Sequence, residues 1–157
     1  MKRSVLVLVI LVIAAGAGRS GAVTPPLGIR GGYTSWESVN QFHFGGHVKL
    51  GDLFPNVALT PNLELGFGDN TTVVAVNGDL VYRFTELANA PWGPYAGGCL
   101  SFIFVDVSGA GSDTDLGLSG VLGTTYALSG GNEVFAEVRL GIMDSPGFKF
   151  TVGYTFF

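Results

Sequence analysis

From Leu27 to the C-terminus the chain alternates apolar residues with small or polar ones, and this alternation restricts the fold more than any other feature. Successive side chains of a β-strand point to opposite faces, so a period of two predicts strands with one apolar and one polar face. Turn-forming residues interrupt the pattern at 69–70, 129–132 and 144–147. The sequence therefore predicts eight strands, at about 27–34, 42–51, 57–67, 74–84, 95–105, 115–128, 134–142 and 148–156.

Alternation does not by itself say which face of the strands is outside. A lipocalin-like soluble barrel has the same period with its apolar face inside, whereas a membrane barrel has its apolar face outside. The composition favours the membrane barrel, because 47% of the residues are hydrophobic and only 13% are charged, against about 25% charged in ordinary soluble domains. So few charges do not coat a water-facing surface.

The charged residues assign the two faces. All five Lys and Arg residues after residue 22 lie on the polar face of a predicted strand: Arg30, Lys49, Arg83, Arg139 and Lys149. Three acidic residues share that phase: Glu64, Asp79 and Glu137. Because unpaired charges inside a barrel are costly, we expect a buried ion-pair network in the lumen, with His43 and His47 as further polar members. The apolar face then meets lipid, and the predicted fold is all-β: an eight-stranded antiparallel up-and-down transmembrane β-barrel.

The N-terminus has the three-part layout of a secretory signal peptide. Lys2 and Arg3 precede an apolar run at residues 5–15, and small residues follow that run. Cleavage after Ala17 or after Ala22 satisfies the preference of signal peptidase for small residues, and we favour Ala22. Residues 1–22 are then the signal peptide and residues 23–157 one barrel domain, in which no apolar stretch approaches the roughly 20 residues of a membrane helix.

An even number of strands places both termini at one end of the barrel, which is the periplasmic end in outer-membrane barrels. The connections at about 35–41, 68–71, 107–114 and 143–147 then lie at the opposite, outward end, and all are short. Aromatic residues fall near two predicted rims, as in the aromatic girdles of membrane barrels. One rim has Tyr33, Trp36, Phe42 and Phe148, and the other has Phe54, Tyr82, Trp92, Tyr126 and Tyr154.

Two stretches resemble a known family. Residues 80–101 read LVYRFTELANAPWGPYAGGCLS, with an aromatic pair at Tyr82 and Phe84, then Pro94-Tyr95 and the glycines at 97–98. This pattern is similar to the small outer-membrane β-barrel domain shared by relatives of OmpA, OmpX and OmpW. The last strand also resembles the signal by which the outer-membrane assembly machinery recognises such barrels, through Tyr154, Phe156 and Phe157. Phe156 is in phase with the lipid-facing residues, whereas Phe157 lies one residue beyond the position usual in the family.

The resemblance implies the outer membrane of a Gram-negative bacterium and delivery by periplasmic chaperones to the assembly machinery. It does not imply one activity, because this fold hosts unrelated functions. We expect a non-enzymatic, monomeric barrel with a structural role in membrane integrity or a small-molecule-interacting role, in contact with outer-membrane lipid and lipopolysaccharide. The acidic balance argues against nucleic-acid binding, and we expect no cofactor.

The alternative function is a narrow channel for small or apolar solutes, as in relatives of OmpW. A surface adhesin is less expected because the outward connections are short, and a lipid-modifying enzyme needs a Ser-His pair that reaches lipid, whereas both histidines lie in the inward phase. His43 and His47 are four strand residues apart, about 13 Å, which is too far for one metal ion without other ligands. Cys99 is the only cysteine, so no internal disulfide is expected.

Overall fold

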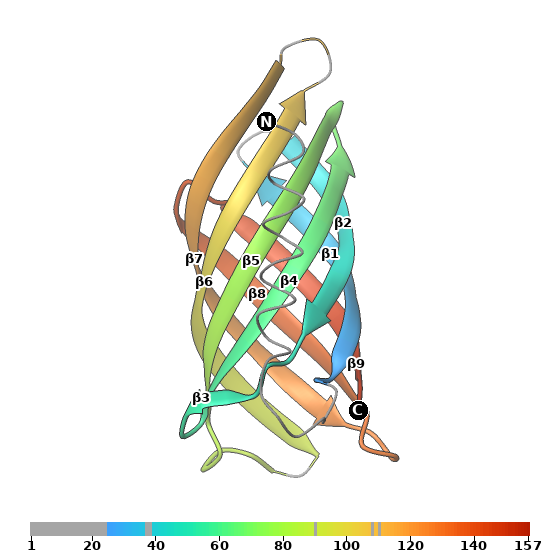
Figure 1. Ribbon diagram of the computed structural model, residues 1–157, viewed down its shortest axis with the longest axis vertical. Coiled ribbons are helices and arrows are strands. Elements are labelled where there is room, and N and C mark those ends of the chain that lie inside the picture. The colour runs from blue at the N-terminus through green and yellow to red at the C-terminus, as the bar shows by residue number, and fades with distance from the viewer. Residues whose placement is uncertain (1–24, 37–38, 90, 108, 110) are drawn as a thin grey trace.

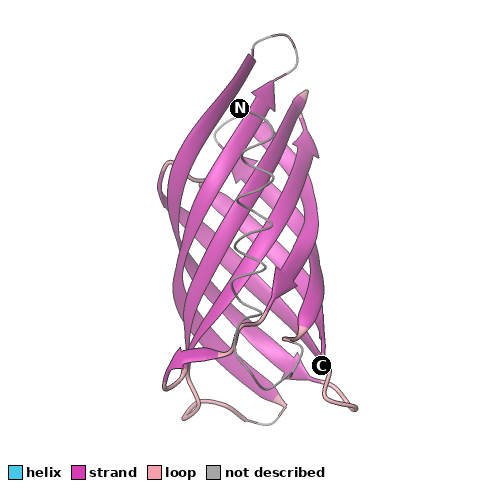
Figure 2. Ribbon diagram, viewed as in Figure 1, coloured by secondary structure: helices cyan, strands magenta, loops and turns pink. Residues whose placement is uncertain are grey.

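The computed structural model describes residues 25–36, 39–89, 91–107, 109 and 111–157, and these residues form a tall β-barrel (Figure 1). Figure 2 shows the wall of the barrel built entirely from strands. The described residues contain no helix long and apolar enough to cross a membrane. The predicted signal peptide, residues 1–22, lies outside the described part of the chain.

Eight long strands run antiparallel, each beside its neighbour in the sequence. They are β1 (Leu27–Trp36), β2 (Val39–Val48), β4 (Val57–Gly68), β5 (Thr71–Arg83), β6 (Trp92–Val107), β7 (Gly111–Ala127), β8 (Glu133–Met143) and β9 (Phe148–Phe156). The sheet closes on itself because β1 pairs with β9, and β2 pairs with β4. The predicted eight-stranded antiparallel barrel is therefore confirmed.

A short additional strand, β3 (Asp52–Phe54), lies in the connection between β2 and β4. It pairs with the first residues of β4, where Phe54 is opposite Val57. Gly51 and Asn56 flank this strand with φ angles of 84° and 63°. Glycine and asparagine tolerate this left-handed region better than other residues, so the chain turns back on itself there. The alternation pattern did not predict this strand.

We call the end at which β1 begins and β9 ends the terminal end, and the opposite end the far end. Connections at the far end are shorter than predicted, because the strands continue into the turns. β4 and β5 are joined by two residues, Asp69 and Asn70, with φ angles of 46° and 57°, as a tight type I′ hairpin requires. β6 and β7 stay paired up to Val107 and Gly111. The predicted connection at 107–114 therefore shrinks to three residues.

The two faces of the barrel wall have the predicted polarity. Inward side chains include charged residues that are almost completely buried, such as Arg30 at 5% exposure and Glu64 at 1%. Outward side chains are apolar and exposed, such as Phe42 at 74% and Leu122 at 65%. A soluble protein shows the opposite arrangement, with charge at the surface and large apolar side chains inside.

Aromatic side chains contact one another near both ends of the outward face. Tyr33 and Phe42 pack edge to face, with ring centroids 6.0 Å apart, on β1 and β2 near the far end. Near the terminal end, Trp92 packs against Tyr126 with centroids 4.8 Å apart. The two predicted aromatic rims thus lie toward opposite ends of the barrel.

Candidate functional site

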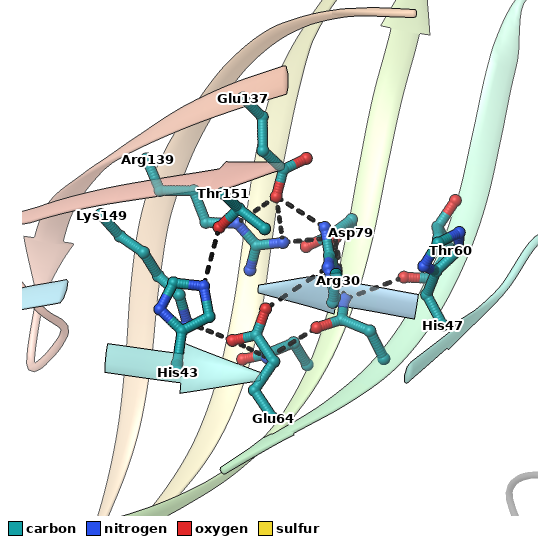
Figure 3. Close-up of polar contacts among 12 residues, drawn as sticks. Arg30, His43, His47, Thr60, Glu64, Asp79, Glu137, Arg139, Lys149 and Thr151 are labelled. Carbon is teal, nitrogen blue, oxygen red and sulfur yellow. Dashed lines mark hydrogen bonds and ion pairs between the residues drawn. The ribbon is translucent and has the colours of Figure 1, made fainter. Parts of the chain in front are cut away.

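Six charged side chains meet inside the barrel, and we call them the ionic layer (Figure 3). Three are basic and three acidic: Arg30 of β1, Arg139 of β8, Lys149 of β9, Glu64 of β4, Asp79 of β5 and Glu137 of β8. All six are buried. Their formal charges cancel, so the layer brings no net charge into the lumen.

Arg30 contacts all three acids of the ionic layer. Its Nη2 lies 2.7 Å from Oε1 of Glu137, and its Nη1 lies 3.3 Å from Oδ2 of Asp79. Its Nε lies 3.5 Å from Oε1 of Glu64. One guanidinium group therefore links strands β1, β4, β5 and β8 across the lumen.

Arg139 and Lys149 complete the pairing of the acids. Nη2 of Arg139 lies 2.7 Å from both Asp79 and Glu137, so each of these carboxylates contacts two guanidinium groups. Lys149 pairs with Glu64. Because desolvating charges is expensive, such a layer is tolerated only when each charge has a close partner, and removing one partner is strongly destabilising.

Neutral polar residues extend the ionic layer. Nδ2 of Asn62 donates to Asp79 at 2.8 Å, and Asn77 donates to Oδ1 of Asn62 at 2.8 Å. The hydroxyl of Tyr95 donates to Glu137 at 3.0 Å. The alternation gives these three residues the inward phase, but it does not connect them to the charges, because cross-strand register is not visible in one strand's pattern.

Phe135 is an inward residue that the sequence prediction missed. Its ring lies 5.2 Å from the Cζ atom of Arg30 and packs edge to face on His47, with centroids 5.3 Å apart. It shares the phase of Glu137 and Arg139 on β8, which was the available signal. Phe135 was left out of the predicted inward residues because it is an apolar side chain in a phase that is otherwise polar.

The two histidines bind threonines rather than the charged residues. Nε2 of His43 lies 3.1 Å from Oγ1 of Thr151, and Nε2 of His47 lies 2.9 Å from Oγ1 of Thr155. Both contacts run from β2 to β9 across β1. The ring of His47 lies over Gly28, where a Cβ atom would come within 2.2 Å of the imidazole. The histidines therefore form hydrogen bonds that connect β2 to β9 across β1 inside the barrel.

Two predicted members of the lumen network lie outside the ionic layer. Arg83 is exposed and pairs with Asp52 of β3, and Lys49 is half-buried and pairs with Glu133. Both residues keep the inward phase, but Arg83 is the last residue of β5 and Lys49 directly follows the last residue of β2. They therefore lie at the terminal end, where the lumen opens. The prediction that they belong to the buried network is corrected accordingly.

Two cavities border the ionic layer on opposite sides. The one toward the terminal end has a volume of about 210 Å³ and is lined by Arg30, Asp79 and Glu137 among others. The one toward the far end has only about 30 Å³ and is lined by Glu64, Arg139 and Lys149 among others. The described residues contain no group of three or more His, Cys, Asp or Glu side chains that could hold a metal ion.

The residues predicted as an assembly signal lie at the terminal end. Tyr154 and Phe156 pack on each other on β9, with ring centroids 4.8 Å apart. Phe156 and Phe157 are both exposed, and the backbone N–H of Phe157 donates to Oδ1 of Asn132 at 3.2 Å. Recognition by assembly machinery stays a prediction.

Comparisons with known proteins support the fold. No family model matches the sequence, and no curated protein matches it. Among solved structures, the chain is similar to the crystal structure of Neisserial surface protein A, with a TM-score of 0.65 and 15% sequence identity. The match covers 83% of this chain and 93% of that chain. At this identity the likeness shows a shared barrel fold, and the resemblance to relatives of OmpA, OmpX and OmpW stays a prediction.

Proposed function

We propose that this chain is a non-enzymatic integral protein of a Gram-negative outer membrane, with a structural role and a lumen closed by the ionic layer. One observation carries the proposal: charged residues are buried inside the barrel, whereas large apolar residues are exposed outside it. Lipid is the solvent in which that arrangement is stable. Closure of the sheet also leaves no unpaired strand edge in the hydrocarbon.

The outer membrane is the bacterial membrane in which closed antiparallel barrels of this kind reside. In the proposed orientation the terminal end faces the periplasm and the far end, with its tight turns, faces outward. Outer-membrane lipid and lipopolysaccharide surround the apolar face. Periplasmic chaperones deliver the unfolded chain to the assembly machinery, and the folded barrel is a monomer. The barrel likeness to a Neisserial surface protein supports this location.

The hydrogen bonds of the lumen support a non-enzymatic role. A lipid-modifying barrel needs a nucleophile and a histidine base that reach lipid. Here His43 and His47 lie inside the barrel and bond threonines. The Ser145 hydroxyl is also engaged, since it donates to the Leu118 carbonyl at 2.9 Å.

A narrow channel is the second candidate function, and the two cavities favour it. Both are lined by residues of the ionic layer, so a rearrangement of that layer would join them. Planar-bilayer recordings separate the two functions. A closed structural barrel remains silent across a range of voltages, whereas a channel shows discrete conductance steps.

Expression of the full chain in a Gram-negative host tests the membrane assignment. We expect the protein in the outer-membrane fraction, solubilised only by detergent, with faster gel migration when unheated than when boiled. Recovery of a folded monomer from the aqueous fraction without detergent would refute the proposal.

A further inference from the structure

The hairpin of β6 and β7 extends beyond β8 at the far end, and one edge of this extension is unpaired (Figure 1). β7 pairs with β6 from Gly111 onward, whereas its pairing with β8 begins only at Leu118. Among the described residues, positions 111–117 of β7 therefore pair with β6 and with no other strand. The edge of a sheet presents backbone N–H and C=O groups without partners, and another strand can pair with them.

The pairing of β7 with β8 ends at a defined place. Leu118 and Ser119 are neighbours on β7, but their partners on β8 are two residues apart, so the register shifts there. Such bulges often terminate strand pairing. The turn after β8 is held at the same place, because the Ser145 hydroxyl donates to the Leu118 carbonyl. Residues 111–116 lie beyond this turn, and we call them the free edge of β7.

The free edge lies beyond the apolar band of the barrel wall. On β6 the outward residues change from Phe104 to Asp106, and on β7 they change from Leu116 to Thr114. Asp106 and Thr114 are both exposed. A strand edge inside hydrocarbon has to be paired. At this height water can satisfy the backbone groups, and an extended peptide can replace that water.

Two acidic residues lie on the inward face of the free edge. Asp113 and Asp115 share the phase of Ser119, which lines the lumen cavity at this end. Asp113 is exposed and Asp115 is half-buried. Each of the five basic residues after residue 22 forms an ion pair with a different acid. In the described part of the chain, neither carboxylate therefore has a basic partner.

The charge of the free edge selects the kind of strand that can join it. A second copy of this chain, paired through the same edge, would place acids against acids, and like charges opposite each other on two strands are destabilising. A strand with lysine or arginine at alternate positions can place all its cations on the face of Asp113 and Asp115. Opposite charges across two strands are stabilising, and backbone hydrogen bonds supply further affinity in strand addition.

We propose that the free edge of β7 binds an extended segment of another protein as an added β-strand, with basic residues at alternate positions of that segment. Backbone hydrogen bonds to residues 111–116 hold the segment, and its basic side chains pair with Asp113 and Asp115. In the proposed orientation, such a partner approaches from outside the cell. The edge is a property of the barrel itself, so the proposal goes beyond the proposed function, and its test in detergent does not depend on the membrane assignment.

Fluorescence anisotropy of labelled peptides on the folded barrel in detergent tests the proposal. The probe is a peptide of about the length of the free edge that alternates lysine and threonine. One control peptide has the same lysines and threonines in two separate blocks, and a second has the alternating sequence with N-methylated backbone amides. We expect saturable binding of the alternating peptide and binding weaker by about fivefold or more for both controls. Absence of saturable binding overturns the proposal, and so does equal affinity for either control.

Two charge variants locate the binding. Asp113→Asn removes one acid of the free edge but keeps the acceptor for the Thr114 N–H, so we expect unchanged folding and an affinity for the alternating peptide lowered about threefold. Asp106→Asn is the matched control, because this exposed acid lies on the outward face of the same hairpin, opposite Ser112. We expect it to leave the affinity unchanged. Equal losses from the two variants would show a response to overall charge and would overturn the proposal.

Amide hydrogen exchange shows whether the peptide pairs with the backbone. In the barrel alone, those amides of residues 111–116 that point away from β6 should exchange rapidly. The saturating alternating peptide should slow their exchange, whereas amides of β9 in the barrel wall should be unaffected and serve as the reference. Unchanged exchange along the free edge at saturation would overturn the proposal.

Discussion

The two halves of the lumen are built differently although one ionic layer separates them. The terminal half contains a cavity of about 210 Å³ with ion pairs at its mouth. The far half contains about 30 Å³ and is covered by the turn at 144–147. This turn folds over Gly117 and Gly141, where a Cβ atom would lie 2.6 Å from backbone oxygens of Asp144 and Pro146 respectively.

The comparison shows two physical means of closing a barrel. At its middle the lumen is closed by charges that pair from several strands. At the far end it is closed by backbone that fits against glycines. Removing one partner of a buried ion pair strongly destabilises the fold. Adding side-chain volume beneath a close-packed turn also destabilises it, because the turn must move. At the mouth of the terminal half the ion pairs are partly exposed rather than buried, and the cavity there is the larger of the two.

The largest expected effect comes from breaking the ionic layer. Arg139→Leu leaves Asp79 and Glu137 with one guanidinium partner fewer, and we expect a loss of about 3–5 kcal/mol in the free energy of unfolding. Arg83→Leu removes an exposed ion pair at the terminal end and should cost less than about 1 kcal/mol. Denaturant unfolding in lipid vesicles measures both. Equal losses would contradict the assignment of Arg139 to the buried layer and Arg83 to the mouth.

A smaller effect is expected from adding volume at the far end. Gly117→Val places a Cβ 2.6 Å from the Asp144 backbone oxygen and 3.0 Å from Cβ of Ser145, so the turn must move. We expect a loss of about 1–3 kcal/mol in the free energy of unfolding. Gly78→Ala is the control, because its Cβ would meet nothing within 4 Å. A Gly117→Val barrel as stable as the control would show that the turn does not cover the lumen closely.

Removing one hydrogen bond from the same turn should have a still smaller effect. Ser145→Ala loses the bond to the Leu118 carbonyl, which we expect to cost about 1 kcal/mol. Ser112→Ala, at an exposed position near the start of β7, serves as the reference in the same unfolding assay. The turn is not anchored by Ser145 if the two variants unfold at the same denaturant concentration.

The smallest effect is expected at the far end outside the lumen. Asp113 is exposed, and its Oδ1 accepts a local hydrogen bond from the backbone N–H of Thr114 at 2.8 Å. Asp113→Asn keeps that acceptor, so the free energy of unfolding should change by less than about 0.5 kcal/mol. A loss as large as that of Arg139→Leu would mean that charge at the far end also holds the barrel together.

The period of two was sufficient to predict the eight strands and the inward phase of the residues that form the ionic layer. It was not sufficient to predict contacts between strands, because these depend on register and on height along the barrel. Asn62 lies opposite Asn77 on the neighbouring strand, which allows the bond between their side chains. Arg83 has the same inward phase as Asp79, but it lies four residues nearer the terminal end and remains exposed.

Local backbone geometry explains the remaining differences. The predicted connections at the far end were too long, because turn residues mark where a chain reverses but not how far the flanking strands extend toward it. Asp69 and Asn70 complete a turn by themselves through positive φ angles. The contact of His47 with β9 depends on Gly28, because a side chain at that position would collide with the imidazole. The sequence shows this role of Gly28 only once strand β1 is known to lie between β2 and β9.

Cys99 offers the most direct measurement of whether the lumen is closed. It is the only cysteine, it has no exposed surface, and its Sγ lies 3.1 Å from Nη1 of Arg139 in the ionic layer. A buried thiol of this kind is inert to solution reagents. In lipid vesicles, a small water-soluble thiol reagent should leave Cys99 of the folded barrel unmodified and should modify it fully after denaturant unfolding. Modification of the folded barrel at the rate of the unfolded chain would contradict a lumen closed by the ionic layer.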